Sequence, residues 1–295
     1  MTGAERGFLL LTACLGDPTQ KPLTVAQFRE LTRRCRAMEK PQTQRELKLE
    51  DLIRLGCDRA FGQRVLALLS RQEQLDWYLE KAKAAGCIPV SRISGDYPNR
   101  LHKTLGLDAP ACLWMKGDQG ILKMPRISLV GSRELRPENR EFARLVGAQA
   151  AKQGYALVSG NARGADREAQ ESCLAHGGFV ICVVADPLME HPQRERVLYV
   201  AEDGYDIAFS SHRALSRNRI IHSLGEKTFV AQCAMEKGGT WSGTEKNLRH
   251  GWSQVFCFAD GSRAAGELCA MGAKAVDLSN PDGLLTQQPD QIEMI

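Results

Sequence analysis

Short apolar runs alternate with helical stretches throughout the second part of the chain. One such stretch has Pro137 near its start, Phe142 and Val146 on one face and Gly154 just past its end, which is the pattern of an amphipathic helix. Because strands that alternate with helices form parallel sheets covered on both sides, residues 126–278 predict an α/β fold: a Rossmann-like, mostly parallel sheet with helices on both faces. The runs expected as strands are residues 127–130, 155–158, 179–185, 205–209, 228–233, 255–258 and 274–278.

The residues before the predicted sheet show a helical period instead. After Thr24, a candidate N-cap, apolar residues recur at helical spacing: Phe28, Leu31, Cys35 and Met38. We expect this part to be a compact helical module that packs or dimerises. A helix-hairpin-helix DNA motif near residues 52–68 is disfavoured, because we find no glycine-bearing hairpin there. The expected division is a helical domain at residues 1–86, an extended lead-in at 87–125, the Rossmann-like domain at 126–278 and a polar tail at 279–295.

Composition and charge narrow the class of protein. A net charge of +4 is compatible with a nucleic-acid partner without requiring one. The longest apolar run near the start, residues 8–11, is too short for a membrane span or a signal-peptide core, so we expect a cytoplasmic protein with no membrane partner. None of the ten cysteines stands in a C-x-x-C pattern and the histidines form no metal motif, which predicts buried free thiols, no metal and no cofactor.

Sheets of this kind bind ligands at the carboxyl ends of their strands, where loops lead into helix N-termini. The first loop, residues 130–133 at the end of the first predicted strand, offers a glycine for close backbone approach, a hydroxyl and a guanidinium. The alternative interpretation is a plain turn with a solvated arginine. The second loop, residues 158–166 after the next predicted strand, has an arginine between two glycines. Its backbone forms an arc whose amides can face an anion. Asp166, at its end, is expected to cap the next helix rather than act as a base. The residues assigned to the site are Gly131, Ser132, Arg133, Ser159, Gly160, Asn161, Arg163 and Gly164.

Two later segments add groups of the same kind. In residues 216–219, two arginines flank an asparagine at the start of a predicted helix. The arginines either bind phosphate oxygens or pair with carboxylates of neighbouring loops. A run of glycines and hydroxyls begins another helix and is a further candidate anion nest. Trp241, inside that run, either stacks on a base or fills the core. These segments contribute Arg217, Asn218, Arg219, Gly239, Thr240 and Ser242.

The order of these segments, GSR, SGNARGAD, SRNRII and GGTWSGT, resembles the DprA/Smf family of DNA-processing proteins over residues 96–278. The resemblance implies a homodimer that is not an enzyme, binds and protects incoming single-stranded DNA, and loads a RecA-type recombinase in natural transformation. Arg133 and Arg163 would then grip backbone phosphates, and Arg217 and Arg219 would extend the pocket.

A second hypothesis stays open, because similar Rossmann-like domains sense nucleotides or hydrolyse them. The segment Gly238–Glu245 resembles a stretched version of the PGGxGTxxE signature of phosphoribohydrolases, in which a glutamate and an arginine act on a nucleoside monophosphate. Here the proline is absent and the spacing is too long, so a nucleotide-binding sensor is the stronger alternative and a hydrolase the weaker one.

Overall fold

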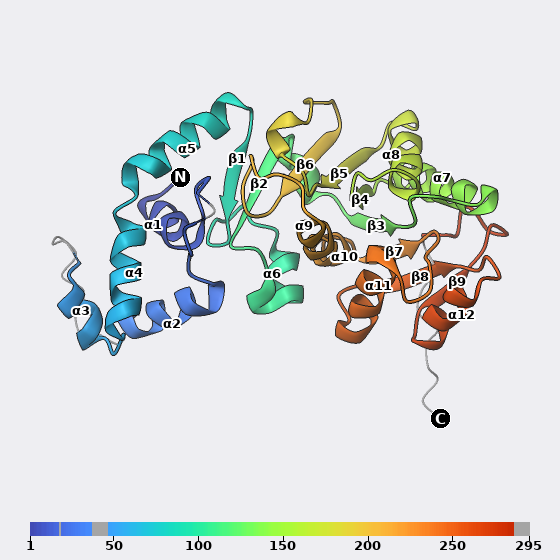
Figure 1. Ribbon diagram of the computed structural model, residues 1–295. Coiled ribbons are helices and arrows are strands. Elements are labelled where there is room, and N and C mark those ends of the chain that lie inside the picture. Colours follow the sequence, from blue (N-terminus) through green and yellow to red (C-terminus); the bar gives the residue numbers. More distant parts are fainter. Residues whose placement is uncertain (18, 37–46, 286–295) are drawn as a thin grey trace.

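One twisted sheet organises the molecule. The computed structural model describes residues 1–17, 19–36 and 47–285, and Figure 1 shows helices on both sides of the sheet. The described helices are α1 (Gly3–Thr12), α2 (Val25–Arg36), α3 (Leu49–Arg54), α4 (Arg59–Leu69), α5 (Gln72–Ala84), α6 (Asn99–Leu105), α7 (Pro137–Lys152), α8 (Ala165–Ala175), α9 (Ser211–Ser216), α10 (Asn218–Leu224), α11 (Gly238–His250) and α12 (Arg263–Ala270). The strands are β1 (Ile88–Ser91), β2 (Cys112–Gly117), β3 (Arg126–Val130), β4 (Ala156–Ser159), β5 (Phe179–Val183), β6 (Val197–Ala201), β7 (Lys227–Val230), β8 (Gln254–Phe258) and β9 (Lys274–Val276).

The strand order is β1-β2-β6-β5-β4-β3-β7-β8-β9. From β6 to β9 every neighbouring pair is parallel, whereas β1 pairs with β2 and β2 with β6 in the antiparallel sense. This arrangement confirms the predicted mostly parallel, Rossmann-like sheet. The order reverses direction at β3, which lies between β4 and β7, and such a switch point is where sheets of this class bind ligands.

Alternate side chains of the strands feed two separate cores. Ile127 of β3 packs with Phe142 of α7 on one face, and Val158 of β4 packs with Ile220 of α10 on the other. Strands buried on both faces read as continuous apolar runs, which is why the sequence revealed them. The predicted helix after the first strand is confirmed as α7, with Pro137 as its first residue.

One predicted strand was wrong and another was missed. Residues 205–209 form no strand, whereas Val197–Ala201, buried throughout, forms β6 between β5 and β2. The connection from β5 to β6 contains only a 3₁₀ turn at Leu188–Glu190, so the expected helix between parallel strands is absent there. The apolar residues of 205–209 resemble a buried strand. Tyr205 is indeed buried, but it packs against the rings of Tyr78 and Trp114 and not within the sheet.

The two flanking segments carry more structure than expected. The lead-in at 87–125 contains β1, α6 and β2, and the buried run from Cys112 to Met115 places β2 inside the sheet. Of the expected polar tail, Leu284 and Leu285 are buried in the core, and the amide of Gln149 donates a hydrogen bond of 3.0 Å to Asp282. Residues 286–295 lie outside the described part of the chain.

The N-terminal region, which we call the helical region, contains α1 to α5. Thr24 caps α2 as predicted, since its hydroxyl accepts a hydrogen bond from the amide of Gln27 at 3.2 Å; Met38, expected on the same helix, lies outside the described residues. A glycine does stand in the turn between α3 and α4, where Gly56 has φ +77°, contrary to the expectation that the hairpin lacks one. Figure 1 shows this region at the β1–β2 end of the sheet, whereas α11 and α12 lie at the opposite end.

The structure also shows the state of the cysteines and the character of the described helices. All ten cysteines are free, and seven of them are buried, as predicted. Among the described residues no group of His, Cys, Asp and Glu could hold a metal ion. No described helix has the length and apolar character that a membrane crossing requires.

A pair of glycine substitutions tests the packing of α7 on α8. A Cβ at position 147 would overlap the carbonyl oxygen of Ala169, so Gly147→Ala should lower the free energy of unfolding by about 1–3 kcal/mol. The control is Gly266→Ala in α12, where a Cβ meets nothing within 4 Å. There the gain in helix propensity should raise stability by about 0.5–1 kcal/mol. Urea unfolding measures both, and equal effects would contradict the close approach of the two helices.

Candidate functional site

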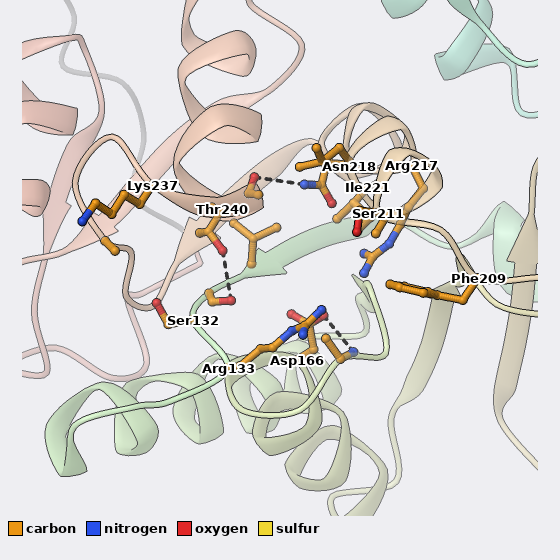
Figure 2. A pocket seen from close by; sticks show the side chains of 18 residues that line it. Ser132, Arg133, Asp166, Phe209, Ser211, Arg217, Asn218, Ile221, Lys237 and Thr240 are labelled. Carbon is orange, nitrogen blue, oxygen red and sulfur yellow. Dashed lines mark hydrogen bonds between the residues drawn. The ribbon is translucent and has the colours of Figure 1, made fainter.

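A cavity of about 510 Å³ opens at the carboxyl end of β3. Its walls come from the loop after β3, the loop before α8, the segments around α9 and α10, and the start of α11, as Figure 2 shows. It therefore lies where the strand order of the sheet reverses, as ligand sites of this fold do. The lining residues are Val130, Gly131, Ser132, Arg133, Ala162, Asp166, Phe209, Ser211, Ala214, Leu215, Arg217, Asn218, Ile221, Ala234, Lys237, Gly238, Gly239 and Thr240.

Half of the predicted site residues line this cavity and half do not. Those that line it come from three of the four predicted segments: Gly131, Ser132, Arg133, Arg217, Asn218, Gly239 and Thr240. The others lie behind it or beside it: Ser159, Gly160, Asn161, Arg163, Gly164, Arg219 and Ser242.

The two arginines that line the cavity differ in their surroundings. Arg133 is exposed and makes no hydrogen bond or ion pair with any described residue. Arg217 lies deeper, and its Nε is shielded from solvent without a hydrogen-bond partner among the described residues. In Figure 2 both side chains extend into the cavity. An unpaired guanidinium N–H that faces a cavity is a donor for an anionic ligand, because burial without an acceptor costs free energy.

Gly160 makes room for Arg217. A Cβ at position 160 would overlap the Arg217 guanidinium, so only glycine lets that group lie against the loop. Burial lowers the pKa of Arg217, and the nearby Asp166 carboxylate opposes this by favouring the charged form. Gly160 thus shapes the cavity through Arg217, although it does not line the cavity itself.

Asp166 holds the second loop together. Its Oδ2 accepts hydrogen bonds from the amides of Gly160 (3.0 Å) and Ala162 (3.1 Å). These amides belong to the loop and not to α8, so the prediction that Asp166 caps the following helix was wrong in its target. Burial raises the pKa of Asp166, while the charges of Arg217 and Arg133 and the two amides lower it. Because the carboxylate already occupies amides of the arc, a ligand would contact the guanidiniums instead.

Hydrogen bonds join the loops around the cavity. The Thr240 hydroxyl donates to the carbonyl of Gly131 and the Asn218 amide donates to the carbonyl of Gly239, both at 3.0 Å. The amide and hydroxyl of Ser132 both donate to the carbonyl of Gln232, at 2.9 and 3.2 Å. The donors of these predicted residues are therefore used to fix the walls. Among the described residues, the lining cations that keep free donors are the guanidiniums of Arg133 and Arg217 and the exposed ammonium of Lys237.

Three other predicted residues have roles inside the protein. Arg219 forms an ion pair with the buried Glu202 at 2.6 Å and so follows the alternative in which an arginine of this pair binds a carboxylate. Ser159 is buried and accepts a hydrogen bond from Gln170 at 2.5 Å. Gly164 has φ +80°, and a Cβ there would overlap the carbonyl oxygens of the first loop.

The remaining three lie near the surface. Arg163 is exposed and does not line the cavity. Asn161 has φ +59°, a left-handed conformation that asparagine tolerates better than most residues, and its side chain accepts from the Cys182 thiol at 3.8 Å. Ser242 lies in the first turns of α11. Trp241 is buried in a core cluster, so the core alternative for this ring is correct.

Sequence reasoning missed several lining residues. Phe209 and Leu215 are 56% and 53% exposed, which is unusual for large apolar side chains. In Figure 2 the ring of Phe209 extends toward the guanidinium of Arg217. Phe209 belongs to residues 205–209, which the sequence assigned to a strand. No local pattern indicates that the residues after β6 return to the end of β3.

His222 supports the helices that form one wall. It is fully buried between α10 and α11, its Nδ1 pairs with Asn247 at 3.0 Å, and its Nε2 has no partner among the described residues. A Cβ at Gly243 would approach that Nε2 to 3.1 Å, so the helices meet closely here. Burial lowers the pKa of His222 from 6.5 to about 3.

The buried histidine predicts a loss of stability in mild acid. Because the unfolded chain takes up a proton on His222 near pH 6.5 and the folded chain does not, stability is complete above that pH and falls below it. Between about pH 6 and about pH 5 the loss should be about 1 kcal/mol. Urea unfolding over a pH series measures it, and His222→Gln should flatten this part of the curve. A wild-type curve that is already flat would contradict a neutral buried imidazole.

Known proteins resemble this chain over most of its length. The family model described as DNA recombination-mediator protein A matches residues 90–286. The DNA processing protein DprA of Streptococcus pneumoniae is 30% identical over 143 residues, which cover 44% of this chain and 50% of that protein. The DNA processing protein DprA of Bacillus subtilis is 29% identical over 206 residues, covering 64% of this chain and 67% of that protein. The chain spans about half of the length of the first curated relatives that it matches.

Solved structures show the same fold. The X-ray structure of DNA processing protein A from Streptococcus pneumoniae superposes with a TM-score of 0.72 at 25% identity, covering 98% of this chain and all of that one. A DNA processing protein A from Helicobacter pylori, whose structure concerns its single-stranded DNA binding mode, superposes with a TM-score of 0.56 at 21% identity. That match covers 68% of this chain and 94% of the other, and at this identity it supports the fold alone.

Proposed function

Because the chain belongs to the DNA recombination-mediator protein A family, we propose that its cavity binds single-stranded DNA through backbone phosphates and performs no chemical step. The observation that carries this proposal is the pair of guanidiniums at the switch point of the sheet. Among the described residues, Arg133 has no hydrogen-bond or ion-pair partner, and the shielded Nε of Arg217 has no acceptor. Both line a cavity in which Asp166 is the lining carboxylate, so cationic groups outnumber anionic ones.

The cavity also offers apolar surface for a base. Phe209 exposes its ring beside Arg217, and Leu215 is exposed on the same wall. A base of a single strand can stack on an aromatic ring, and such stacking tolerates any base. A duplex keeps its bases stacked on one another, so this combination of guanidiniums and an exposed ring favours single-stranded DNA.

The hydrolase hypothesis receives no support from the fourth segment. Glu245, the residue that would act on a nucleotide, forms an ion pair with Arg249 at 2.8 Å and does not line the cavity. Thr244 is buried inside α11. We therefore propose a binding protein. Loading of a RecA-type recombinase, protection of incoming DNA and a homodimer follow from membership of the family, and we include them in the proposal on that basis.

The proposal gives Arg163 and Arg219 different roles. Arg219 is engaged with Glu202, so we assign it to the support of α10. Arg163 is exposed on the loop before α8, next in sequence to Ala162 of the cavity wall, and we keep it as a phosphate contact for the strand as it leaves the cavity.

Binding of labelled oligo-dT, followed by fluorescence anisotropy over a salt series, tests the proposal. Arg133→Ala and Arg217→Ala should each weaken binding, and each should reduce the salt slope by roughly one unit, because one phosphate contact is lost. Arg163→Ala should have a smaller effect on affinity. Arg263→Ala, whose side chain is exposed on α12 away from the cavity, is the control and should bind as the wild type does.

Two outcomes would count against the proposal. If the oligonucleotide does not bind at low salt, the DNA hypothesis fails. If nucleotides raise the melting temperature and bind with little dependence on salt, the cavity belongs to a nucleotide sensor instead.

Gly160→Ala gives an independent test of how Arg217 is placed. The new Cβ displaces the Arg217 guanidinium, so the melting temperature should change about as much as it does in Arg217→Ala. Affinity for oligo-dT should also fall about as far as in Arg217→Ala, within a few tenths of a log unit. The control is Gly154→Asn after α7, where a Cβ meets nothing and φ is +74°. Full affinity of Gly160→Ala would show that the observed position of Arg217 is not the one that binds DNA.

A further inference from the structure

One wall of the cavity belongs to the irregular segment that follows β6. Residues 202–210, which we call the strap, connect the end of β6 to α9 and bring Phe209 to the cavity. The strap contains no helix or strand. Its shape therefore depends on the groups that hold it. The backbone amide of Met189, in the turn after β5, donates to the carbonyl of Tyr205 at 3.0 Å, and further contacts come from two other parts of the protein.

The first set of groups belongs to the cavity side. The guanidinium of Arg213, in α9, donates to the carbonyls of Ile207 (2.7 Å) and Ala208 (3.0 Å). Glu202, at the start of the strap, binds Arg219 of α10. These contacts fix the strap to the helices that follow it in the chain.

The second hold comes from the helical region. The hydroxyl of Tyr78, in α5, donates to Oδ1 of Asp206 at 2.5 Å, and the Tyr78 side chain is only 1% exposed. The ring of Tyr78 also lies 4.7 Å from the ring of Tyr205 between centroids. Burial and the Asp206 carboxylate both raise the pKa of Tyr78, so the hydroxyl keeps its proton and remains a donor at neutral pH.

The backbone on both sides leaves space for this hydrogen bond. A Cβ at Gly204 would lie 2.7 Å from the Tyr78 hydroxyl oxygen, and a Cβ at Gly16 would lie 3.1 Å from the Tyr78 ring. Gly204 belongs to the strap and Gly16 to the helical region. Glycine on both sides thus permits the close approach of the two parts at this point.

We propose that the helical region sets the position of the cavity wall through the hydrogen bond from Tyr78 to Asp206, which makes Tyr78 a positioning residue for the ligand. Asp206 and Phe209 are three residues apart in a strap without regular structure, so a shift of the carboxylate moves the ring that faces the ligand. The effect on affinity rests on the proposed function of the cavity. The effect on the strap itself does not.

The chain offers a matched control for the loss of a buried hydroxyl. Tyr97 is 4% exposed and its hydroxyl donates to the carbonyl of Pro110 at 2.8 Å. It makes no hydrogen bond to the described residues 203–210, although the charge of Glu202, at the start of the strap, acts on it. Tyr78→Phe and Tyr97→Phe each remove one buried hydrogen bond and keep the ring. Both should lower the melting temperature, whereas only Tyr78→Phe should act on the strap.

Hydrogen exchange of the free protein tests the positioning without any ligand. In Tyr78→Phe the amides of residues 203–210 should exchange faster than in the wild type, and in Tyr97→Phe they should not. Unchanged exchange of the strap in Tyr78→Phe would overturn the proposal. If Tyr78→Phe does not fold, Asp206→Ala removes the same hydrogen bond from the partly exposed side and is judged by the same criterion.

Oligo-dT affinity then tests the consequence for the ligand. Tyr78→Phe should weaken binding about five- to tenfold, a typical size for coupling between distant sites. In a Phe209→Ala background the same substitution should weaken binding no further, although it lowers the melting temperature equally in both backgrounds. Additive losses of affinity would mean that Tyr78 acts through general stability, and would overturn the positioning role. Absence of oligo-dT binding by the wild type would refute the proposed function, while the exchange experiment would still decide on Tyr78.

Discussion

The buried carboxylate of Asp166 is the group on which the cavity depends. It accepts two amides of the loop after β4 and lies beside the positive charge of Arg217. Burial alone would favour the neutral carboxyl, and the charges of Arg217 and Arg133 oppose that preference. Arg217 is in the converse position, since burial disfavours its charge and Asp166 favours it. Each buried ion thus offsets part of the desolvation cost of the other, as paired charges must in a protein interior.

This pairing leaves the arginine prepared for a third charge. Oδ2 of Asp166 accepts hydrogen bonds from two backbone amides, whereas Nε of Arg217 has no acceptor among the described residues. A phosphate that entered the cavity would supply that acceptor, and the guanidinium would not need to reorganise to bind it. Preorganised donors of this kind raise affinity because little conformational entropy is lost on binding. Arg133 is exposed and has no partner in the part of the chain that the structure describes, which suits first contact with a polyanion.

The sequence predicted the sheet, and it predicted the edge of the sheet at which the cavity opens, because both depend on local patterns. Buried strands are apolar runs, and loops after them in parallel sheets converge at one edge. It could not separate Arg217 from Arg219, because the partner of Arg219 is Glu202, which lies in a different segment of the chain at the end of β6. The strap was misread for the same reason: Tyr205 is buried by the ring of Tyr78, which no local pattern reveals.

The junction between the helical region and the sheet shows why a single hydrogen bond can matter. Tyr78, Trp114 and Tyr205 pack their rings against one another, with centroids 4.7–5.3 Å apart. Apolar burial of this kind is strong but not directional, so it holds the two parts together without fixing how the strap lies. A hydrogen bond to a carboxylate has a defined geometry. The Tyr78 hydroxyl therefore supplies the direction that the aromatic cluster lacks. Its acceptor, Asp206, stands three residues before Phe209, whose ring lines the cavity.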